Sequence, residues 1–374
     1  MVGAGVIGSS IAYHLARSGA EVALLDPGSP RYPSASWASA GGVRRQGRDP
    51  REWQLTTAAW RRWAGLADEL GADIGFRAGG HLHVAETEEE LERLVRRAEA
   101  ERAAGLEVEL VDGAAARDLA PILSLSVLGG TWTAGDGQAD PRRTTEAFQR
   151  AAVRHGAVFI EHAVERLKVS GEGLEVRAHG EIVDARWTVL AAGSWTAALV
   201  RGLGVRLPVR MEGLQMLVSD PDPRALGPTV GAEGRAISFK QLADGRFLVG
   251  GGWPADVDAA AHTCDLRAES IEGSWRAARG LFPSLAGRQI ADLWCGLESI
   301  SIDGVPPVGP LPGVEGAYLA TGFCGHGFQL SPALGEAVAR ALGGAESPSL
   351  APLSPDRQAG VDPERVDAFL AGEA

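Results

Sequence analysis

Three glycines near the start of the chain are spaced as in a phosphate-binding turn. Gly3, Gly5 and Gly8 form a G-x-G-x-x-G pattern, residues 9–18 are expected to form a helix, and residues 21–25 a short strand that ends at Asp26. The glycines would make the turn, let the backbone approach a pyrophosphate and let the helix pack closely on the strand, while Asp26 would accept hydrogen bonds from a ribose. The pattern predicts a dinucleotide site; the alternative is a helix that happens to begin with glycines.

The strand before this turn is short in the sequence. Only Met1 and Val2 precede Gly3, whereas a typical strand has about five residues. We therefore expect a weak first strand at the place where the cofactor would dock.

A second glycine-rich turn lies near the other end of the chain. Residues 316–323 are expected to form a strand and a turn, residues 333–342 form a helix, and Gly322, Gly325 and Gly327 lie between them. Backbone N–H groups in such a turn, and the positive end of the helix, could stabilise negative charge on a reduced flavin. Two such units predict a clamp on both ends of a large cofactor; the alternative is two ordinary loops.

Several segments resemble the D-amino-acid oxidase and sarcosine oxidase superfamily of FAD enzymes. They are residues 39–46 (SAGGVRRQ), 189–195 (VLAAGSW), 244–251 (DGRFLVGG), 294–297 (WCGL) with 303–309 (DGVPPVG), and 321–332 (TGFCGHGFQLSP). The matches follow the family order from Gly3 to about Arg357. The resemblance implies bound FAD, contacted by Gly3, Gly5, Val6, Ile7, Gly8, Asp26, Ser39, Ala40, Gly41, Gly42, Val164, Ala192, Gly193, Trp195, Cys295, Gly322, Gly325, His326, Gly327, Phe328 and Gln329.

The resemblance also implies a reaction on a small-molecule amine. A hydride equivalent would leave the carbon beside the nitrogen of an N-alkyl or D-amino acid type substrate for flavin N5, and the imine would then be hydrolysed. The amine must be neutral when it reacts. Two alternatives remain open: an NAD(P)-dependent dehydrogenase, and a flavoprotein subunit or assembly factor without amine oxidase activity. Similar-sized relatives serve as subunits, so a partner subunit or a homo-oligomer is compatible with this chain.

Four residues are candidates for contact with the substrate: Arg45, Lys240, Glu298 and His326. Glu298 follows the W-x-G-L segment, where amino-acid-oxidising relatives often have an arginine that pairs with the substrate carboxylate. The substrate would then present a cation to Glu298, or its carboxylate is held elsewhere, for example by Arg44 or Arg45; the alternative is a peripheral glutamate. Gln329 takes the place of a lysine in sarcosine oxidases, which argues against sarcosine itself.

Two other side-chain types bear on cofactor or metal chemistry. Cys295 matches the cysteine that bonds covalently to flavin in monomeric sarcosine oxidases, but a small buried cysteine is the simpler interpretation. We expect non-covalent FAD, with a covalent link at Cys295 as the alternative. His81 and His83 alternate along one expected strand. Two ligands are too few for a typical metal site, so no metal is predicted.

The expected fold class is α/β: a Rossmann-like FAD-binding domain with an interleaved α+β substrate domain built on an antiparallel sheet. The resemblance divides the chain into an FAD-binding domain of residues 1–79, 140–210 and 296–345 and a substrate domain of residues 80–139 and 211–295. Helices are expected over residues 86–105 and 141–155, and hairpin strands between residues 158 and 189. Residues 346–374 are expected to form a surface tail, with residues 352–357 packed on the FAD-binding domain.

Composition suggests many tight turns or close backbone contact with a large ligand, and it disfavours several other classes of protein. The chain has 374 residues, of which 50 are glycine, about twice the ~7% that is usual. The net charge of -12 disfavours nucleic-acid binding. Three scattered cysteines suit a reducing compartment better than a disulfide framework. No apolar run is long enough to span a membrane and no signal peptide is recognisable, so we expect a cytoplasmic protein.

Overall fold

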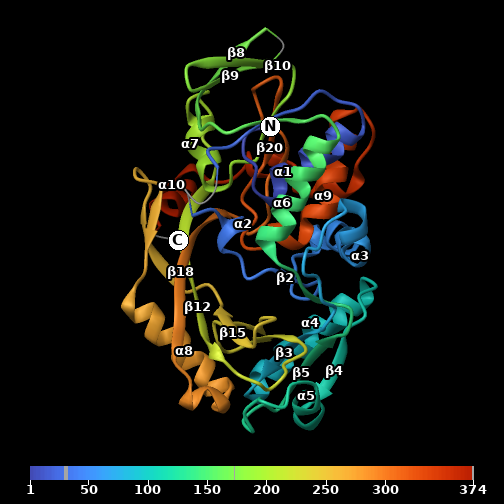
Figure 1. Cartoon of the computed structure of the whole chain (residues 1–374), viewed down its shortest axis with the longest axis vertical. Helices are drawn as coiled ribbons and strands as arrows, with labels where there is room; N and C mark the ends of the chain where they lie inside the picture. Colours follow the sequence, from blue (N-terminus) through green and yellow to red (C-terminus); the bar gives the residue numbers. More distant parts are fainter. Residues whose placement is uncertain (29–32, 172, 373–374) are drawn as a thin grey trace.

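A parallel sheet forms the centre of the upper half of the molecule (Figure 1). The computed structural model describes residues 1–28, 33–171 and 173–372. Val2 forms a bridge on one side to Leu25 and on the other to Leu190, and this single residue joins two groups of strands into one layer. The strands, in spatial order, are β7 (Val158–Ile160), β1 (Ala23–Leu25), then Val2, β11 (Thr188–Leu190), β20 (Ala317–Ala320) and the antiparallel β19 (Val308–Pro310).

The short first strand is thus fully paired. The Val2 N–H donates to Val189 O at 2.9 Å, and the Gly3 N–H donates to Leu25 O at 2.8 Å. Two residues suffice here because both neighbouring strands are present to receive them. The expected weakness of this strand is offset by its central position.

Helices cover one face of this sheet and a small antiparallel sheet covers the other. α1 (Val6–Arg17) packs between α6 (Pro141–Arg154) and α9 (Gly327–Leu342), and α3 (Trp53–Leu70) packs on α9. Leu24, Val189 and Tyr318 point into the core beneath these helices. Leu25, Leu190 and Leu319 point the opposite way, as strand alternation requires. They meet β8 (Val164–Ser170), β9 (Gly173–Ala178), β10 (Glu181–Ala185) and α7 (Thr196–Arg201).

A larger, mostly antiparallel sheet forms the lower half. Its longest strands are β12 (Val209–Pro221) and β18 (Ile290–Ser301), which pair side by side in opposite directions. From β12 the sheet continues through β15 (Arg246–Gly250), β14 (Ser238–Gln241), β13 (Thr229–Ala232), β3 (His81–Ala85), β5 (Gly129–Thr133) and β4 (Glu109–Asp112); β16 (Pro254–Asp258) and β17 (Thr263–Asp265) form its other edge.

One face of this sheet is apolar and the other is polar. Leu82, Phe239 and Leu217 lie in a core closed by α8 (Ala268–Leu281), with α5 (Gly113–Leu119) at the far end; α4 (Glu88–Ala103) packs on β3 and β5 outside this core. His81 and Lys240 alternate with these core residues and belong to the opposite face. The structure is therefore the expected α/β fold with an added antiparallel sheet.

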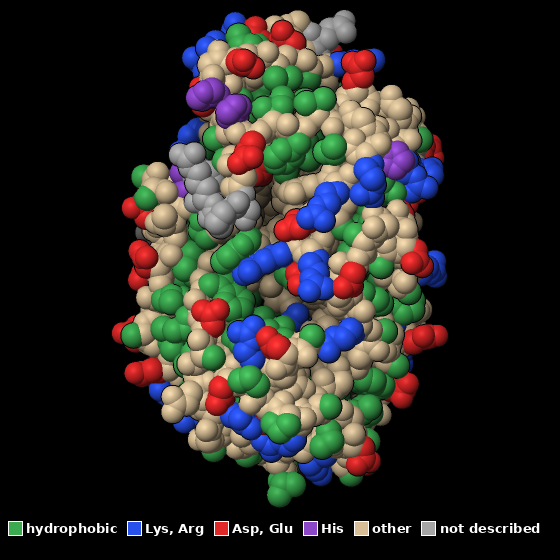
Figure 2. Space-filling model, in the orientation of Figure 1, with side chains coloured by type: hydrophobic (Ala, Val, Ile, Leu, Met, Phe, Trp, Pro, Cys, Tyr) green, Lys and Arg blue, Asp and Glu red, His purple; other side chains and the backbone are tan. Residues whose placement is uncertain are grey.

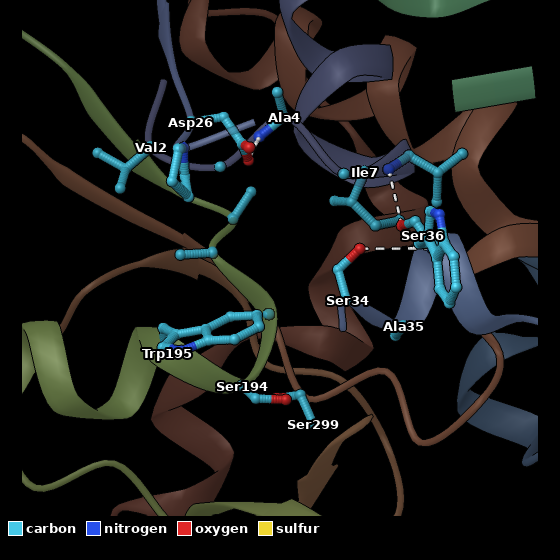
Figure 3. A pocket seen from close by; sticks show the side chains of 18 of the residues that line it. Val2, Ala4, Ile7, Asp26, Ser34, Ala35, Ser36, Ser194, Trp195 and Ser299 are labelled. Carbon is cyan, nitrogen blue, oxygen red and sulfur yellow. Dashed lines mark hydrogen bonds between the residues drawn. The ribbon is translucent and has the colours of Figure 1, made fainter. Parts of the chain in front are cut away.

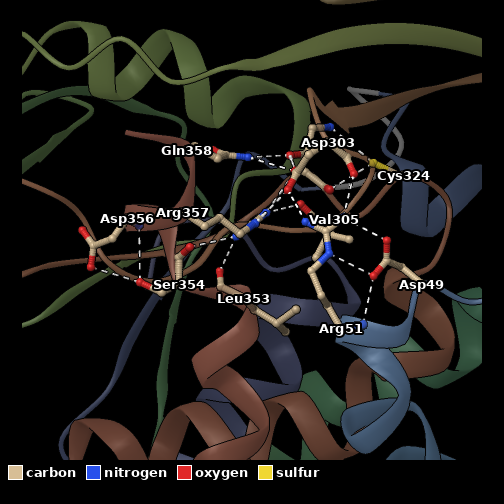
Figure 4. A network of polar contacts seen from close by, with 12 residues as sticks. Asp49, Arg51, Asp303, Val305, Cys324, Leu353, Ser354, Asp356, Arg357 and Gln358 are labelled. Atoms are coloured by element: carbon tan, nitrogen blue, oxygen red, sulfur yellow. Dashed lines mark hydrogen bonds and ion pairs between the residues drawn. The ribbon is translucent and has the colours of Figure 1, made fainter. Parts of the chain in front are cut away.

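Short elements connect the two halves. They are α2 (Ala35–Ala38), β2 (Gly42–Val43) paired with β6 (Gly137–Gln138), η1 (Pro50–Glu52), η2 (Gly193–Trp195) and η3 (Pro283–Gly287). Residues after 346 form η4 (Pro348–Leu353), η5 (Pro355–Gln358) and α10 (Pro363–Ala371). Arg357 in η5 bonds to Asp303, so this segment is folded onto the turn that follows β18 (Figure 4).

Two further findings concern expectations from the sequence. A disulfide joins Cys264 in β17 to Cys295 in β18, so the expectation that the cysteines form no disulfide is wrong; the cysteine count could not reveal that the β16–β17 hairpin folds back beside β18. Among the described helices, none has the length and apolar character needed to cross a membrane.

Candidate functional site

The first glycine turn has the geometry that its pattern predicts. Gly3 has φ +98°, and a Cβ there would lie 2.4 Å from Ala191 O. A Cβ on Gly8 would lie 1.9 Å from Gly3 O, so this glycine lets α1 sit directly on the turn. Gly5 faces outward, and its nearest neighbour would be Ser36 Oγ at 3.0 Å. The turn therefore offers bare backbone at the positive end of a helix, which suits a phosphate group.

Asp26 lies beside this turn at the end of β1. Its Oδ2 accepts a hydrogen bond from the Ala4 N–H at 2.8 Å, and its Oδ1 accepts one from the Gly28 N–H at 2.9 Å. Burial raises the pKa of Asp26, while the two backbone N–H groups lower it in part. Each oxygen keeps a second lone pair, so the carboxylate can still accept hydrogen bonds from a ribose diol.

A long cavity runs from Asp26 to the second glycine turn (Figure 3). Its volume is about 1020 Å³, at the upper end of the ~300–1,000 Å³ that is usual for small-molecule and cofactor sites. Most of the cofactor contacts expected from the sequence line it: Gly3, Gly5, Val6, Ile7, Asp26, Ser39, Val164, Ala192, Gly193, Trp195, Gly325, Gly327 and Phe328, together with Glu298.

Several lining residues were missed by sequence reasoning. Five come from one face of α6: Arg142, Thr145, Glu146, Gln149 and Arg150. Their spacing of three and four residues is that of a single helical face, so the signal was present but was assigned to no site. The Gln149 side-chain amide donates to Ala4 O at 2.7 Å and so braces the glycine turn.

The segment around α2 was also missed. Ser34, Ala35, Ser36 and Trp37 line the cavity, and Figure 3 shows the first three beside the first turn. Ser36 Oγ accepts a hydrogen bond from the Val6 N–H at 2.9 Å, and the Ser34 side chain caps α2 by accepting from the Trp37 N–H at 3.4 Å. Ser36 thus occupies one backbone N–H of the first turn of α1 in this structure, and Ser34 occupies one of α2.

The second glycine turn closes the opposite end of the cavity. Thr321 Oγ1 donates to Gly193 O at 2.9 Å and lies 3.1 Å from Ser299 Oγ, which in turn accepts from the Gly322 N–H at 3.1 Å. The Cys324 N–H donates to Ser299 O at 3.0 Å. These bonds hold η2, β18 and the turn together at the point where α9 begins. The turn is therefore a rigid end wall.

Glu298 lies in this end wall, on β18. It is half-buried and lines the cavity. Its Oε1 accepts a hydrogen bond from the Ser299 N–H at 3.1 Å. Burial raises the pKa of Glu298 to about 7, although the backbone N–H groups of Ser299 and Gly325 favour the charged form; Glu212 on β12 raises the pKa further. The structure thus places this glutamate at the end of the cavity that the second glycine turn closes.

The remaining predicted cofactor contacts lie outside the cavity lining: Gly8, Ala40, Gly41, Gly42, Cys295, Gly322, His326 and Gln329. Gly41 has φ +68°, and a Cβ there would lie 2.2 Å from Ala139 O, so it serves chain packing. Gln329 donates to Thr56 O at 3.0 Å and its backbone carbonyl accepts from Trp63 Nε1 at 2.9 Å. The Gln329 side chain is therefore part of the α3–α9 interface and does not line the cavity.

Cys295 is the clearest correction. Its sulfur is bonded to Cys264 in a disulfide, and Cys295 is not among the residues that line the cavity. A thiolate free to attack a flavin is therefore absent from this position in the structure. The match of Cys295 to the flavin-bonding cysteine was made by its spacing to Ile302 and Asp303, and spacing alone does not show which way a strand residue points.

Two of the predicted substrate residues are buried outside the cavity lining. Arg45 has its Nε 3.2 Å from Asp136 Oδ1 and its guanidinium 3.7 Å from the ring centre of Trp60. Lys240 is buried on β14, where desolvation and Arg77 lower its pKa to about 8. The expectation that these two cations meet the ligand is therefore not met by the cavity that the structure shows.

His326, another predicted substrate residue, lies in the second glycine turn and is also outside the cavity lining. Its Nδ1 lies 3.2 Å from Glu52 Oε2. Burial, aided by the charge of Arg48, lowers the pKa of His326 to about 4 despite this pairing. His326 therefore braces the turn against η1 as a neutral ring and leaves Gly325 and Gly327 to face the cavity.

Two neighbouring arginines lack a carboxylate partner. Arg48 is buried and Arg44 half-buried, and neither forms an ion pair with any described residue, although the more distant charges of Asp136 and Glu101 favour ionised Arg44 and those of Glu52 and Asp136 favour ionised Arg48. Arg48 Nη1 is buried with no hydrogen-bond partner within the described chain. Burial, together with Arg44, lowers the pKa of Arg48 to about 9. Figure 2 shows Lys and Arg side chains around a hollow between the two halves. Guanidinium groups of this kind favour an anionic ligand.

No metal centre is found among the described residues. His83 Nε2 lies 3.3 Å from Glu233 Oε2, and His81 Nδ1 lies 2.8 Å from the Gln46 side-chain amide. Both histidines have lowered pKa values because they are buried. They belong to the polar face of the large sheet as neutral hydrogen-bonding groups.

A glycine turn beneath a helix, an acidic residue at the end of the second strand and a long cavity closed by a second turn define a dinucleotide-binding oxidoreductase whose cofactor carries a ring system. The model of the FAD-dependent oxidoreductase family, DAO, matches residues 1–341. The chain therefore belongs to this family, its cofactor is FAD, and the nicotinamide alternative is not supported. The bare turn at Gly5 and the wall at Gly325 fit the two ends of FAD.

Known proteins of this family align over nearly the whole chain. Glycine oxidase of Geobacillus kaustophilus is 30% identical, covering 96% of this chain and 97% of that protein. A subunit of the opine oxidase of Rhizobium meliloti is 28% identical, covering 85% and 86%. The crystal structure of the Geobacillus kaustophilus glycine oxidase superposes with a TM-score of 0.87, covering 94% of this chain and 96% of that one.

Proposed function

We propose that this flavoenzyme oxidises the C–N bond of a small amine that also carries a carboxylate, such as an amino acid or an N-substituted amino acid. Oxidation of a C–N bond is the activity of the family members that this chain resembles, including proteins named glycine oxidase and iminodiacetate oxidase. The finer assignment rests on one observation: Arg44 and Arg48, which like Arg45 lie outside the cavity lining, act electrostatically on His326 in the turn that closes the cavity, and neither forms an ion pair with a described carboxylate.

The position of these arginines supports binding of the substrate carboxylate. Both influence His326, which belongs to the turn that closes the cavity. Glu298, in place of the arginine common at that position in amino-acid-oxidising relatives, cannot pair with a carboxylate but can pair with an amine. A substrate with its carboxylate toward Arg44 and Arg48 and its nitrogen toward Glu298 would meet opposite charges at both ends.

The cofactor, when bound, supplies the hydride acceptor. The protein's part is to bind and orient. The Gly3–Gly8 turn would hold the pyrophosphate, Asp26 the ribose, and the wall formed by Gly325 and Gly327 the ring. Ile7, Phe323 and Phe328 contribute apolar lining near that end and exclude water. Exclusion of water strengthens each charge–charge contact.

Anaerobic bleaching of the flavin tests this function. The purified holoenzyme is mixed with N-methylglycine, glycine and D-alanine, and with N-methylethylamine and ethylamine as partners that lack the carboxylate. We expect a carboxylated amine to bleach the visible absorbance band of the flavin and its partner without a carboxylate to be much slower. Equal rates for both kinds of amine would contradict a carboxylate site, and no bleaching by any amine would contradict amine oxidation.

A second proposal concerns assembly. The relative named as an opine oxidase subunit aligns over 85% of this chain, which supports a partner subunit as electron acceptor or as a source of substrate. Size-exclusion chromatography with light scattering, on protein purified from the native cell, distinguishes a hetero-complex from a homo-oligomer or a monomer. A monomer that turns over with oxygen at full rate would contradict the proposal.

A further inference from the structure

Glu298 is the acidic group of the ring-end wall that is left without a cationic partner among the described residues. We propose that Glu298 is a catalytic proton acceptor: it takes one proton from the ammonium group of the substrate, so that the nitrogen lone pair becomes available when the hydride leaves. This inference rests on the proposed amine oxidation. It adds a named base to a reaction for which the sequence offered none.

The geometry supports this role. Glu298 lines the cavity, whereas Glu52 is fully buried behind the wall and is paired with His326. The Ser299 N–H donates to Glu298 Oε1 at 3.1 Å, which fixes the carboxylate on the strand. The other end-wall residues that line the cavity, Ser299, Phe323 and Gly325, carry no titratable side chain. Among these end-wall residues, Glu298 is the one whose side chain can accept a proton from a bound amine; His262 also lines the cavity, and its Nδ1 accepts a hydrogen bond from the indole N–H of Trp195.

The described groups that surround Glu298 include no cation that would hold its carboxylate in the ionised form. On β12, Glu212 faces it across the ladder and is itself bonded to Arg210. On the second turn, Cys324 keeps its thiol proton because burial raises its pKa to about 12, and His326 is neutral. The contacting elements α2 and η2 carry no ionisable side chain, and β17 carries Cys264, which is held in a disulfide, and the exposed Asp265. No cation among these groups neutralises Glu298.

The resulting acid–base balance suits a general base. Burial and Glu212 raise the pKa of Glu298 to about 7, and two backbone N–H groups prevent a larger rise. A base is most effective when its pKa lies near the working pH. The step is balanced: the ammonium N–H bond breaks, the glutamate O–H bond forms, and the hydride then leaves the adjacent carbon for the flavin while the nitrogen lone pair forms the imine bond.

The pH dependence of flavin reduction tests the proposal. In the wild-type holoenzyme, the second-order rate constant for anaerobic bleaching should rise with pH through an apparent pKa near 7, because only ionised Glu298 accepts the proton. In Glu298→Gln the rise with an apparent pKa near 7 should be absent. The rate constant at pH 7 should be about 10²-fold lower than in the wild type. It should rise only at higher pH, as the pH approaches the pKa of the free amine. Equal rates for both enzymes at pH 7 would overturn the proposal.

A matched control and a readout independent of turnover complete the design. Glu212→Gln removes the neighbouring negative charge, which raises the pKa of Glu298. The rate constant of flavin reduction at high pH should therefore stay as in the wild type, while the apparent pKa of its pH dependence moves to lower pH. Titration of the oxidised holoenzyme without substrate should show a change in the flavin spectrum near pH 7 that Glu298→Gln lacks. If the flavin is never reduced by an amine, the proposed function fails. If wild type and Glu298→Gln titrate alike, the assignment of Glu298 fails.

Discussion

Arg357 Nε lies 2.9 Å from Asp303 Oδ2 and fastens the C-terminal segment to the turn after β18. Figure 4 shows how Arg357 lies at the centre of a network that also contains Arg51 and Gln358. Arg51 donates to the same Oδ2 at 2.7 Å, and Gln358 donates to Ser301 Oγ at 2.8 Å. The aspartate therefore joins η1, β18 and η5, three segments that come from distant parts of the sequence.

Replacing Arg357 should destabilise the protein. Arg357→Met removes two bonds to Asp303 and others to backbone carbonyls, including Leu353 O. We expect the free energy of unfolding to fall by about 2 kcal/mol, the usual size for hydrogen bonds to charged groups. Arg365→Met, an exposed position on α10, is the control and should change it by less than about 0.5 kcal/mol. Urea unfolding of both variants measures the difference.

The same aspartate predicts a loss of stability in acid. Burial would raise the pKa of Asp303, but hydrogen bonds and charge from Arg357 outweigh it and hold the pKa well below its usual range. The folded state thus binds the proton less tightly than the unfolded state. The stabilisation is present above the unfolded pKa, about 3.9, and is lost as the pH falls below it. Thermal melts from pH 6 to pH 3 should fall less steeply for Asp303→Asn than for wild type.

Two glycines of the first turn should respond differently to alanine. Gly8→Ala places a Cβ 1.9 Å from Gly3 O, a backbone atom that cannot move alone, so both stability and FAD binding should fall. Gly5→Ala meets only Ser36 Oγ at 3.0 Å, so its apoprotein should melt near wild type while FAD binds more weakly. Melting of the apoproteins and FAD titration separate the two effects. An unchanged melting temperature for Gly8→Ala would contradict the packing role.

Asp26 should matter for cofactor affinity. Asp26→Ala removes the acceptor for the Ala4 and Gly28 N–H groups and for a ribose. We expect the dissociation constant of FAD to rise about tenfold, the equivalent of one hydrogen bond to a charged group. Asp68→Ala, on α3 and away from the cavity lining, should leave it unchanged. Equilibrium dialysis with FAD measures both; equal affinity in all three proteins would exclude a ribose contact.

Arg48 and Arg45 form a matched pair for stability and substrate binding. Arg48→Met removes a buried cation that has no carboxylate partner among the described residues, so stability should rise by about 1 kcal/mol, while the KM for a carboxylated amine rises at least about tenfold. Arg45→Met leaves Asp136 buried and without its cation and should cost about 3 kcal/mol. Chemical unfolding and steady-state kinetics test both. A loss of stability in Arg48→Met would show that this arginine has a structural role.

The sequence predicted the backbone of the site better than its side chains. The glycine turns, Asp26 and the hairpins after residue 158 depend on local rules of turn and strand formation, and they are found in the structure. Arg45 and Gln329 were interpreted as facing a ligand because their partners, Asp136 and Thr56, lie 91 and 273 residues away. Such pairings arise only when the chain is folded, so no local pattern indicates them.

The long ladder of β12 and β18 has a mechanical consequence. Val209, at one end of β12, lies in the core beneath the cofactor sheet, and Leu217 lies in the core of the large sheet. A continuous antiparallel pair of this length, roughly 40 Å, is a rigid connection whose two ends are packed in different hydrophobic cores. A hinge motion that separated the two halves of the molecule would have to disrupt both hydrophobic cores. We therefore expect substrate to come and go by movement of surface loops while the two halves keep a fixed distance.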